Sequence, residues 1–448
     1  MADRHAGIWS RAADSPIKKG NLIATGTETR FSYTDEFLSQ NQVAGLSLLT
    51  SPALYGDNPV IHRATEILPL HPRLMALIPG RASHNIQRRA YAEILAKHTP
   101  PPAPGFATEW ELLMLTGHNG IGHIDVFRDD LEAERWYTQK HSDASAICKR
   151  SVFWNFVKQD IEVSLNDSDI GIVSLIGPTP SVGGMIPKIL VAIPDLDEWD
   201  GCIAEPGTHF IDEQKYVDVI LKIEYPEYAG LAALETLALD THKALEFETP
   251  RHWHTHIDGM NLIAIERFDR TADGYPIPME SFFSVMASGA TDIQSATGTE
   301  MERVGNMLDT LPRIANINAS EAQLEVYKRF ITALFTGNGD LHLENLAFLG
   351  GNSNTHISPV YDPSPMRAWP RHNLLSAIPF VIENNLHHSL IKLGESFSLS
   401  ANDASDIIQH IRHQTEAFTA QVAALETVPQ VTRNHLIKAI EDVRNKTQ

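Results

Sequence analysis

The chain has 448 residues, of which 43% are hydrophobic and 21% charged, enough for two or more packed units and unlike a disordered composition. Its formal net charge of −20 argues against direct binding of nucleic acid, because contacts to phosphates need Lys and Arg. The two cysteines lack zinc-site or disulfide spacing, no apolar run approaches bilayer length, and the N-terminal MADRHAGIWSR lacks a signal-peptide core. We therefore expect a cytoplasmic protein without a membrane partner.

The first hundred residues contain patterns of both strands and helices. RFSYTDEFL (30–38) alternates like a strand and then breaks, and residues 63–78 and 85–97 have apolar residues at helical spacing. The proline cluster TPPPAPGF (99–106) cannot continue a helix, so we expect a stiff connector between subdomains at this point.

The middle of the chain is predicted to be rich in strands. YVDVILKIE (216–224) alternates clearly, with valine, leucine and isoleucine on one face and Lys222 on the other. The other elements expected in this part are strands at 171–175, 188–193 and 261–270, a polar hairpin at 194–216 and a helix at 230–247.

Helical patterns dominate from residue 278 onward. SEAQLEVYKRFITALF (320–335) begins with Ser320 and Gln323, which have the spacing of a capping box. A long helix is expected from Asn402 to Glu426, followed by a second helix after Pro429. A strand-rich part followed by a helical part predicts an α+β fold with two lobes.

The segment TGNGDLHLENLAFL (336–349) places charged and polar residues directly after an apolar helix. Asp340 and Asn345 are separated by four residues, as in the Asp-x-x-x-x-Asn loop of protein kinases. Phosphoryl transfer needs a carboxylate near the attacking hydroxyl and an oxygen ligand for Mg²⁺, and this loop supplies both. A helix C-terminal turn with an Asn cap accounts for the same residues equally well, so the motif alone stays a hypothesis.

Two further features fit the same chemistry. ISPVYDPSP (357–365) places Asp362 after a strand-like run, where kinases have a second metal ligand, although Asp-Pro is also a common turn. Glu235 falls on the apolar stripe of its helix, where an unpaired charge is costly, so Lys222 is its natural partner. A structural salt bridge, or a stripe edge that reaches water, would satisfy the same pattern.

Two other motifs are weaker. The adjacent glycines of PSVGGMIPK (180–188) could let backbone N–H groups approach phosphates, but a hairpin turn explains them more simply, and the spacing is not that of a Walker A loop. His252, His254 and His256 alternate in RHWHTH, and surface histidines in a loop are a better explanation than a metal site.

In this order, the segments resemble the HipA family of bacterial serine/threonine kinases, the toxins of HipBA-type toxin–antitoxin pairs. SVGGMIPK resembles the family's phosphate loop, VILKIE its lysine strand, LETLALDTHKALEFETP its Glu-bearing helix and AIERFDR its hinge. TGNGDLHLENLAFL resembles the catalytic loop and SPVYD the metal-binding segment. RFSYTDEFL, AGLSLL and EWELLMLTGHNGIGHIDVF resemble the N-terminal stretches, so the resemblance covers nearly the whole chain.

The resemblance implies a two-lobed protein-kinase-like fold that binds ATP and Mg²⁺ between its lobes. It divides the chain into an N-terminal subdomain (1–105), the remainder of the N-lobe (106–268) and a helical C-lobe (269–448). The family suggests a translation factor such as an aminoacyl-tRNA synthetase as the protein substrate, with growth arrest as the outcome. It also suggests a HipB-like helix-turn-helix antitoxin as a partner, through which DNA would be bound only indirectly.

The same resemblance implies roles for individual residues. Asp340 would be the catalytic base, and Asn345 and Asp362 would hold Mg²⁺. Lys222, with Glu235 as its partner, would contact the phosphates. The implied ATP site comprises Gly183, Gly184, Lys188, Lys222, Glu266, Phe268, His342, Asn345 and Asp362, with adenine bound by backbone groups of 266–268.

One residue departs from the family pattern. Many relatives carry a basic residue just before the Asn, whereas this chain has Glu344, which cannot neutralise charge on the transferring phosphoryl group. GDLHLEN also resembles the loop of aminoglycoside-phosphotransferase-type kinases, so a small-molecule kinase is one alternative. An inactive kinase-like corepressor or scaffold is another, against which the intact set of polar residues argues. Ser181 matches a serine that some family members autophosphorylate.

Overall fold

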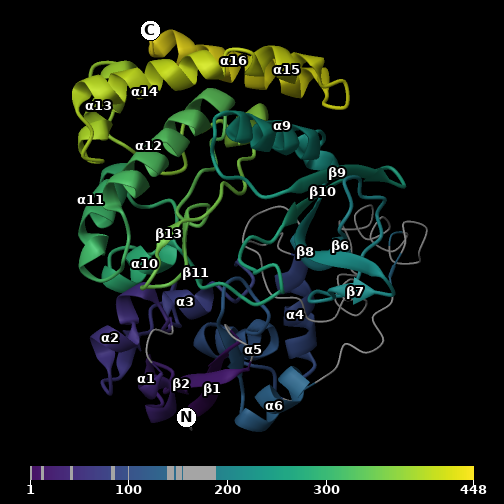
Figure 1. The fold of residues 1–448 in the computed structure, drawn as a ribbon, viewed down its shortest axis with the longest axis vertical. Coiled ribbons are helices and arrows are strands. Elements are labelled where there is room, and N and C mark those ends of the chain that lie inside the picture. The colour runs from purple at the N-terminus through teal and green to yellow at the C-terminus, as the bar shows by residue number, and fades with distance from the viewer. Residues whose placement is uncertain are drawn as a thin grey trace. The chain divides into compact units, whose positions relative to one another are not determined.

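The computed structural model describes residues 3–11, 15–40, 44–81, 86–98, 100–138, 146–147, 154 and 188–448. It divides into two compact units (Figure 1). Unit 1 comprises Met1–Tyr225 and His252–Glu280, and unit 2 comprises Pro226–Arg251 and Ser281–Gln448. The three domains expected from the sequence, with boundaries at 105/106 and 268/269, stay predictions. Ser181, Gly183 and Gly184 lie outside the described residues.

The N-terminal part of unit 1 is built on an antiparallel five-stranded sheet of order β4-β3-β2-β1-β5. The strand expected in RFSYTDEFL is confirmed, and it ends where Thr34 caps a short helix by accepting a hydrogen bond from the backbone N of Phe37. Alternate residues such as Ile8, Leu22 and Phe31 are buried in one core. The strands are β1 (Arg4–Ser10), β2 (Ile17–Ala24), β3 (Glu28–Tyr33), β4 (Val60–Arg63) and β5 (Asp125–Phe127).

Several helices pack against this sheet. The helix expected at 85–97 is confirmed as α4, but only one turn forms within 63–78, because Pro69 and Pro72 interrupt the helical spacing. The proline cluster ends at Phe106, where α5 begins. The helices are α1 (Asp35–Ser39), η1 (Leu48–Thr50), α2 (Pro52–Tyr55), α3 (Pro72–Met75), α4 (Ile86–Ala96), α5 (Phe106–Thr116) and α6 (Asp130–Thr138).

A second antiparallel sheet in unit 1 has the order β6-β8-β10-β9, with β7 paired to β8. RHWHTH is a strand rather than the expected loop, because Trp253 is buried and His254 and His256 alternate with it on the exposed face. The described residues contain no group of three or more His, Cys, Asp or Glu side chains that could hold a metal ion. The strands are β6 (Lys188–Pro194), β7 (Phe210–Ile211), β8 (Gln214–Ile223), β9 (His252–Ile257) and β10 (Met260–Glu266).

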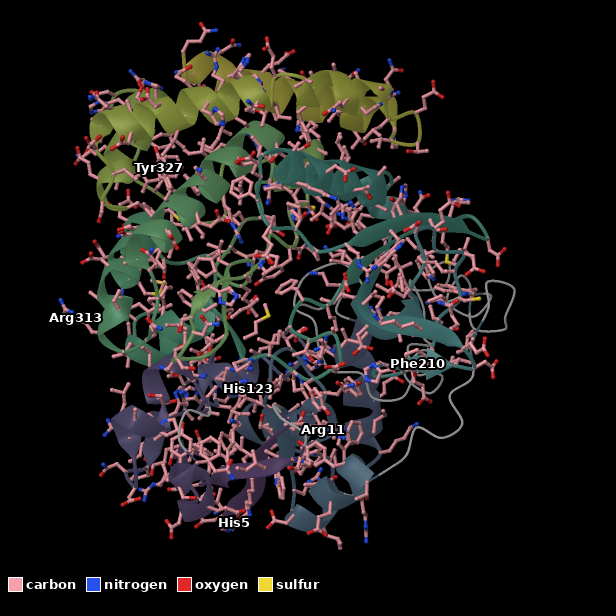
Figure 2. The ribbon with its side chains drawn as sticks, viewed as in Figure 1. His5, Arg11, His123, Phe210, Arg313 and Tyr327 are labelled. Atoms are coloured by element: carbon pink, nitrogen blue, oxygen red, sulfur yellow. The ribbon has the colours of Figure 1, made fainter. Side chains whose placement is uncertain are left out.

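Unit 2 is mainly helical. Its central helix is α12, which carries Tyr327 (Figure 2). Tyr327 is buried and donates a hydrogen bond of 2.9 Å to the carbonyl of Leu390. Its helices are α9 (Leu231–Ala244), α10 (Phe282–Gly289), α11 (Met301–Thr310), α12 (Ala319–Thr336), α13 (Leu386–Glu395), α14 (Ala401–Gln414), α15 (Phe418–Ala424) and α16 (Gln430–Lys446). Shorter elements are η2 (Pro226–Tyr228), η3 (Leu311–Arg313), β12 (Ala347–Leu349), β13 (His356–Ile357), η4 (Met366–Ala368) and η5 (Pro370–His372), and β11 (Met279–Ser281) lies at the unit boundary.

Two helix boundaries in unit 2 differ from the expectation. The cap of α12 is Asn318 rather than Ser320, because the Asn318 side chain accepts the N–H of Glu321, while Gln323 is buried and donates to Ser398. The single long helix expected up to Glu426 is two helices, α14 and α15.

The break between α14 and α15 has a cause distant in sequence. Arg444 of α16 donates a 2.8 Å hydrogen bond to the carbonyl of Arg412 and a 2.9 Å bond to Oγ1 of Thr415. The guanidinium thus binds groups at the C-terminal end of α14, where carbonyls lack helical partners. Among the described residues, no helix is long and apolar enough to cross a membrane.

Candidate functional site

The polar loop of unit 2 starts where α12 ends. Gly337 closes the helix in the left-handed conformation, with a φ of 73°. A Cβ at this position would lie 2.4 Å from Cδ1 of Leu436 in α16, and the left-handed backbone is strained for any residue other than glycine. Asn338, which is buried, then accepts the backbone N–H of Asp340 at 3.0 Å. These contacts fix the turn that presents Asp340.

Asn345 is tied back to Asp340. Its Nδ2 donates to the Asp340 carbonyl over 3.1 Å, and its backbone N donates to the His342 carbonyl over 2.9 Å. Its Oδ1 accepts no hydrogen bond from any residue that the structure describes. An amide oxygen with no donor among the described residues suits a hard cation such as Mg²⁺. The Asp340–Asn345 motif is therefore one compact loop.

Asp362 and Glu235 are joined through Ser364. The Oγ of Ser364 lies 2.9 Å from Oε2 of Glu235 and 3.3 Å from Oδ1 of Asp362. Glu235 is fully buried on α9, as its place on the apolar stripe predicted, and Asp362 has a φ of 81°, which a residue other than glycine seldom adopts. Such strained backbone is common at ligand sites, and a hydroxyl that holds a carboxylate orients it for a metal.

Tyr361 links the two polar segments. Its Oη donates a hydrogen bond of 2.6 Å to the carbonyl of Glu344, next to Asn345. Burial raises the pKa of Tyr361 far above its usual range, and the nearby carboxylates of Asp362 and Glu344 add to the shift. The phenol therefore stays a neutral donor. The loop at 340–345 and the segment carrying Asp362 consequently lie together within unit 2.

Glu344 is exposed at the surface of this loop. Its backbone N donates to Nδ1 of His342 at 3.2 Å, and its carbonyl accepts from Tyr361. Among the described residues its carboxylate forms no ion pair. The backbone is thus held while the charge faces solvent.

A phenol near Asp340 was not foreseen from the sequence. Tyr228 hydrogen-bonds to Nε2 of His372 at 2.9 Å, and Arg371 lies over its ring. Its pKa is raised first by burial and then by the charge of Asp340. Tyr228, Tyr361 and Ser364 carry no motif of their own, and only their contacts with the motif residues reveal them.

Unit 1 brings two lysines together. Lys188 of β6 and Lys222 of β8 are directly paired across the sheet, and both are buried, with exposed fractions of 7% and 4%. Two buried lysines on one face of this sheet are cations of the kind that bind phosphates. Glu266 ends β10, and Phe268 follows it half-buried. Lys222 and Glu235 belong to different units, so their ion pair stays a prediction.

Comparison with known proteins decides the family. A family model described as the HipA-like C-terminal domain matches residues 180–419, more than half of the chain. The chain belongs to the HipA-like family. The resemblance noted in the sequence is thereby confirmed, and the matched part includes every motif of the candidate site.

Two relatives of the chain are named as kinases. The chain is 26% identical over 222 residues to a Haemophilus influenzae protein named "Putative kinase", covering 47% of this chain and 61% of that protein. It is 24% identical over 176 residues to "Putative kinase Y4dM" of Sinorhizobium fredii, covering 36% of this chain and 38% of that protein. The chain therefore spans less than two thirds of the length of either relative.

The fold of this HipA-like chain also has a solved counterpart. It matches HipA in a Shewanella oneidensis complex of the toxin–antitoxin system HipA, HipB and its operator DNA, with a TM-score of 0.64. The match covers 96% of this chain and 97% of that one at 16% identity, so it shows the fold alone. The mixed α/β fold with several sheets agrees with the expected class.

Proposed function

We propose that this chain is an ATP-dependent kinase with a two-lobed protein-kinase-like fold, which phosphorylates serine or threonine in a protein. One observation carries the proposal: the Asp340–Asn345 loop and the segment carrying Asp362 are joined by the hydrogen bond from Tyr361 to the Glu344 carbonyl. Membership of the HipA-like family and the names of the relatives support it.

The residues of unit 2 divide the chemical work. Asp340 accepts the proton of the attacking hydroxyl, as the loop aspartate does in protein kinases. Asn345 and Asp362 supply oxygen ligands of the kind that Mg²⁺ prefers, and Ser364 orients Asp362. When bound, Mg²⁺ neutralises charge on the phosphates.

The residues of unit 1 bind the nucleotide. Lys188 and Lys222 offer two buried positive charges to the phosphates, together with the backbone of Gly183 and Gly184. The backbone of Glu266 and Phe268 takes the adenine. His342, whose Nδ1 accepts the backbone N–H of Glu344, is the remaining residue of the proposed ATP site.

Family resemblance suggests the protein substrate, the cellular effect and the partner of this kinase. The substrate would be a translation factor such as an aminoacyl-tRNA synthetase, its phosphorylation would arrest growth, and the protein would act in the cytoplasm. A HipB-type helix-turn-helix antitoxin would be the partner, since the Shewanella structure is named as a complex of HipA, HipB and operator DNA. Autophosphorylation of Ser181 stays a prediction.

A second candidate function follows from Glu344. Its carboxylate is exposed beside the loop and has no ion-pair partner among the described residues, which suits a cationic small molecule. A kinase of the aminoglycoside-phosphotransferase type is therefore the competing activity.

One experiment separates the candidates. Purified chain is incubated with γ-labelled ATP, Mg²⁺ and cell lysate, beside Asp340→Asn and the exposed control Asp406→Asn. We expect a labelled protein band with the wild type and the control and none with Asp340→Asn. Label confined to small metabolites would support the second candidate, and equal labelling by Asp340→Asn would refute the assigned mechanism.

A further inference from the structure

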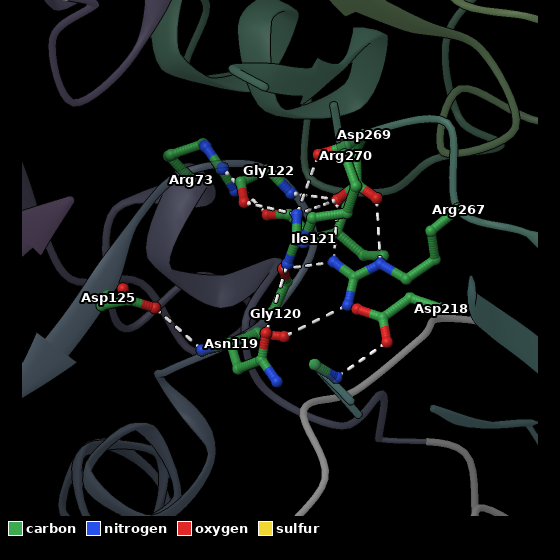
Figure 3. Close-up of polar contacts among 11 residues, drawn as sticks. Arg73, Asn119, Gly120, Ile121, Gly122, Asp125, Asp218, Arg267, Asp269 and Arg270 are labelled. Atoms are coloured by element: carbon green, nitrogen blue, oxygen red, sulfur yellow. Dashed lines mark hydrogen bonds and ion pairs between the residues drawn. The ribbon is translucent and has the colours of Figure 1, made fainter. Parts of the chain in front are cut away.

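The sequence ERFDR (266–270) contains a buried ionic cluster in unit 1 (Figure 3). The carboxylate of Asp269, 2% exposed, accepts 2.9 Å hydrogen bonds from Nε and Nη2 of Arg267 and from Nη1 of Arg270. It also accepts the backbone N–H of Gly122 at 2.7 Å. Every donor except Gly122 lies within two residues, so Gly122 is the contact that reaches another part of the fold.

The two arginines also form hydrogen bonds with the loop that contains Gly122. Nη2 of Arg267 and Nη2 of Arg270 donate to the carbonyl of Gly120 at 2.7 and 3.0 Å, and Nη1 of Arg270 donates to Gly122 at 3.2 Å. The loop at 119–122 connects α5 to β5 of the N-terminal sheet. Residues 266–270 thus hold this loop through both its N–H and its carbonyl groups.

Gly122 is shaped for this contact. Its φ is 79°, and a Cβ there would lie 2.7 Å from Nη2 of Arg73 and 2.9 Å from the carbonyl of Met279. Only glycine therefore brings the backbone this close to Asp269.

The cluster also continues the sheet β6-β8-β10-β9, which carries Lys188 and Lys222. The backbone N of Arg267 donates to the carbonyl of Asp218 at 2.9 Å, which continues the pairing of β10 with β8. Lys222 lies four residues farther along β8, on the same face as Asp218. Arg267 itself stands between Glu266 and Phe268, the residues assigned to adenine.

The charges of the cluster are held in their ionised forms. Burial alone would raise the pKa of Asp269, but Arg267 and Arg270 outweigh it and hold that pKa well below the usual range. A buried carboxylate between two arginines has a defined geometry, because each arginine offers its donors in a fixed fork. The cluster is therefore rigid enough to position a backbone segment.

We propose that Asp269 is a positioning residue for nucleotide binding: it fixes the 266–268 backbone to the 119–122 loop, so that the N-terminal part of the chain sets the place of the adenine-binding segment. This rests on the proposed function, which assigns adenine to 266–268. The loop lies outside residues 180–419, the part that the family model matches. The N-terminal part thus contributes to nucleotide affinity without touching the nucleotide.

The test compares two probes by isothermal titration calorimetry on the full chain. One is the non-hydrolysable ATP analogue AMP-PNP with Mg²⁺, which needs both adenine and phosphate contacts. The other is inorganic tripolyphosphate with Mg²⁺, which needs the phosphate contacts only. With Asp269→Asn we expect the Kd of AMP-PNP to rise about fivefold, the loss of roughly one hydrogen bond, and the Kd of tripolyphosphate to stay constant.

Two further variants keep the test decisive. Arg270→Lys retains the charge but cannot fork to both glycine carbonyls, so it should give the same pattern more weakly, and it replaces Asp269→Asn if that variant fails to fold. Glu109→Gln is the matched control, because Glu109 is an equally buried carboxylate bound by Arg81 and Arg88. It should lower stability and leave both Kd values unchanged.

The remaining outcomes are distinct. The N-terminal part is also held at Glu280, which accepts hydrogen bonds of 2.8 Å from Ser47 and Leu48. Because these bonds do not involve Asp269, we expect the Asp269 variant to fold. An unchanged Kd for AMP-PNP, or an equal loss for both probes, would overturn the positioning role. If neither probe binds the wild-type chain, the proposed function itself fails.

Discussion

Ser364 donates a hydrogen bond from its Oγ to Oε2 of Glu235 over 2.9 Å, and the same hydroxyl lies 3.3 Å from Oδ1 of Asp362. A helix carboxylate and a metal-ligand candidate are thus joined by one hydroxyl, 129 residues from Glu235 in sequence. The hydroxyl has a single proton, so the two carboxylates share it as the acceptors of one bifurcated hydrogen bond.

Ser364→Ala should raise the Mg²⁺ concentration that gives half the maximal rate of phosphoryl transfer about tenfold, because Asp362 loses the group that orients it. A Mg²⁺ titration of the transfer rate measures the change. Ser376→Ala is the control, since its hydroxyl also donates within unit 2, to the carbonyl of Ile378, which is not a residue of the candidate site. An unaltered Mg²⁺ midpoint in Ser364→Ala would contradict the orienting role.

Tyr361→Phe removes the hydrogen bond to the Glu344 carbonyl. We expect about 1 kcal/mol less free energy of unfolding and a lower kcat, because the loop and the Asp362 segment lose their link. Urea unfolding and initial rates measure the two effects. Tyr327→Phe provides a match, since Tyr327 also donates to a backbone carbonyl, and it should lose similar stability at an unchanged kcat. Equal kcat values in both variants would count against the link.

Glu344→Lys should raise the rate of phosphoryl transfer about tenfold, because a cation beside the loop stabilises the transferring phosphoryl group. Glu344→Gln should lie between the wild type and Glu344→Lys. Neither change should alter the unfolding midpoint, since the side chain is exposed and forms no ion pair with the described residues. A rate lowered by lysine would indicate instead that the carboxylate binds a cationic substrate.

Lys19 predicts a pH dependence of stability. Burial first, and Arg73 second, lower its pKa from 10.5 to about 7, against an opposing effect of Asp125. Between these values the unfolded chain binds a proton that the folded chain does not, so the free energy of unfolding rises with pH. We expect a gain of about 2 kcal/mol from pH 7 to pH 9.

Urea unfolding of the wild type and of Lys19→Met at the two pH values checks this expectation. The variant should lose most of the gain, because methionine fills the buried position without a proton to bind. Lys438→Met, an exposed control on α16, should keep it. An identical gain in Lys19→Met would mean that other groups cause the pH dependence.

The strands were predictable where apolar residues alternate with polar ones, as in β3, or form a short continuous run that is buried throughout, as in β6. β3, β6 and β8 each have a local pattern of apolar residues, and local patterns are visible in sequence. RHWHTH also alternates, but its three histidines led to the prediction of a loop, and the structure has a strand there. The break at Thr415 was not predictable, because its partner Arg444 lies 29 residues away.

The candidate site divides in the same way. Asp340 and Asn345 could be predicted as site residues from their spacing, and Asp362 from its place after a strand-like run shortly downstream. Tyr361 and Ser364 have no such spacing, and their roles appear only from hydrogen bonds to other segments. The contact of Asp269 with Gly122 spans 147 residues, which no local pattern can reveal.

The tight seat of Gly337 against Leu436 has a practical consequence for handling this protein. The last helix closes over the first residue of the polar loop, and its Arg444 also holds the end of α14. Removing α16 to obtain better crystals would therefore remove the contacts that hold the polar loop at Gly337. Affinity tags belong at the other terminus, where no side chain of α16 is disturbed.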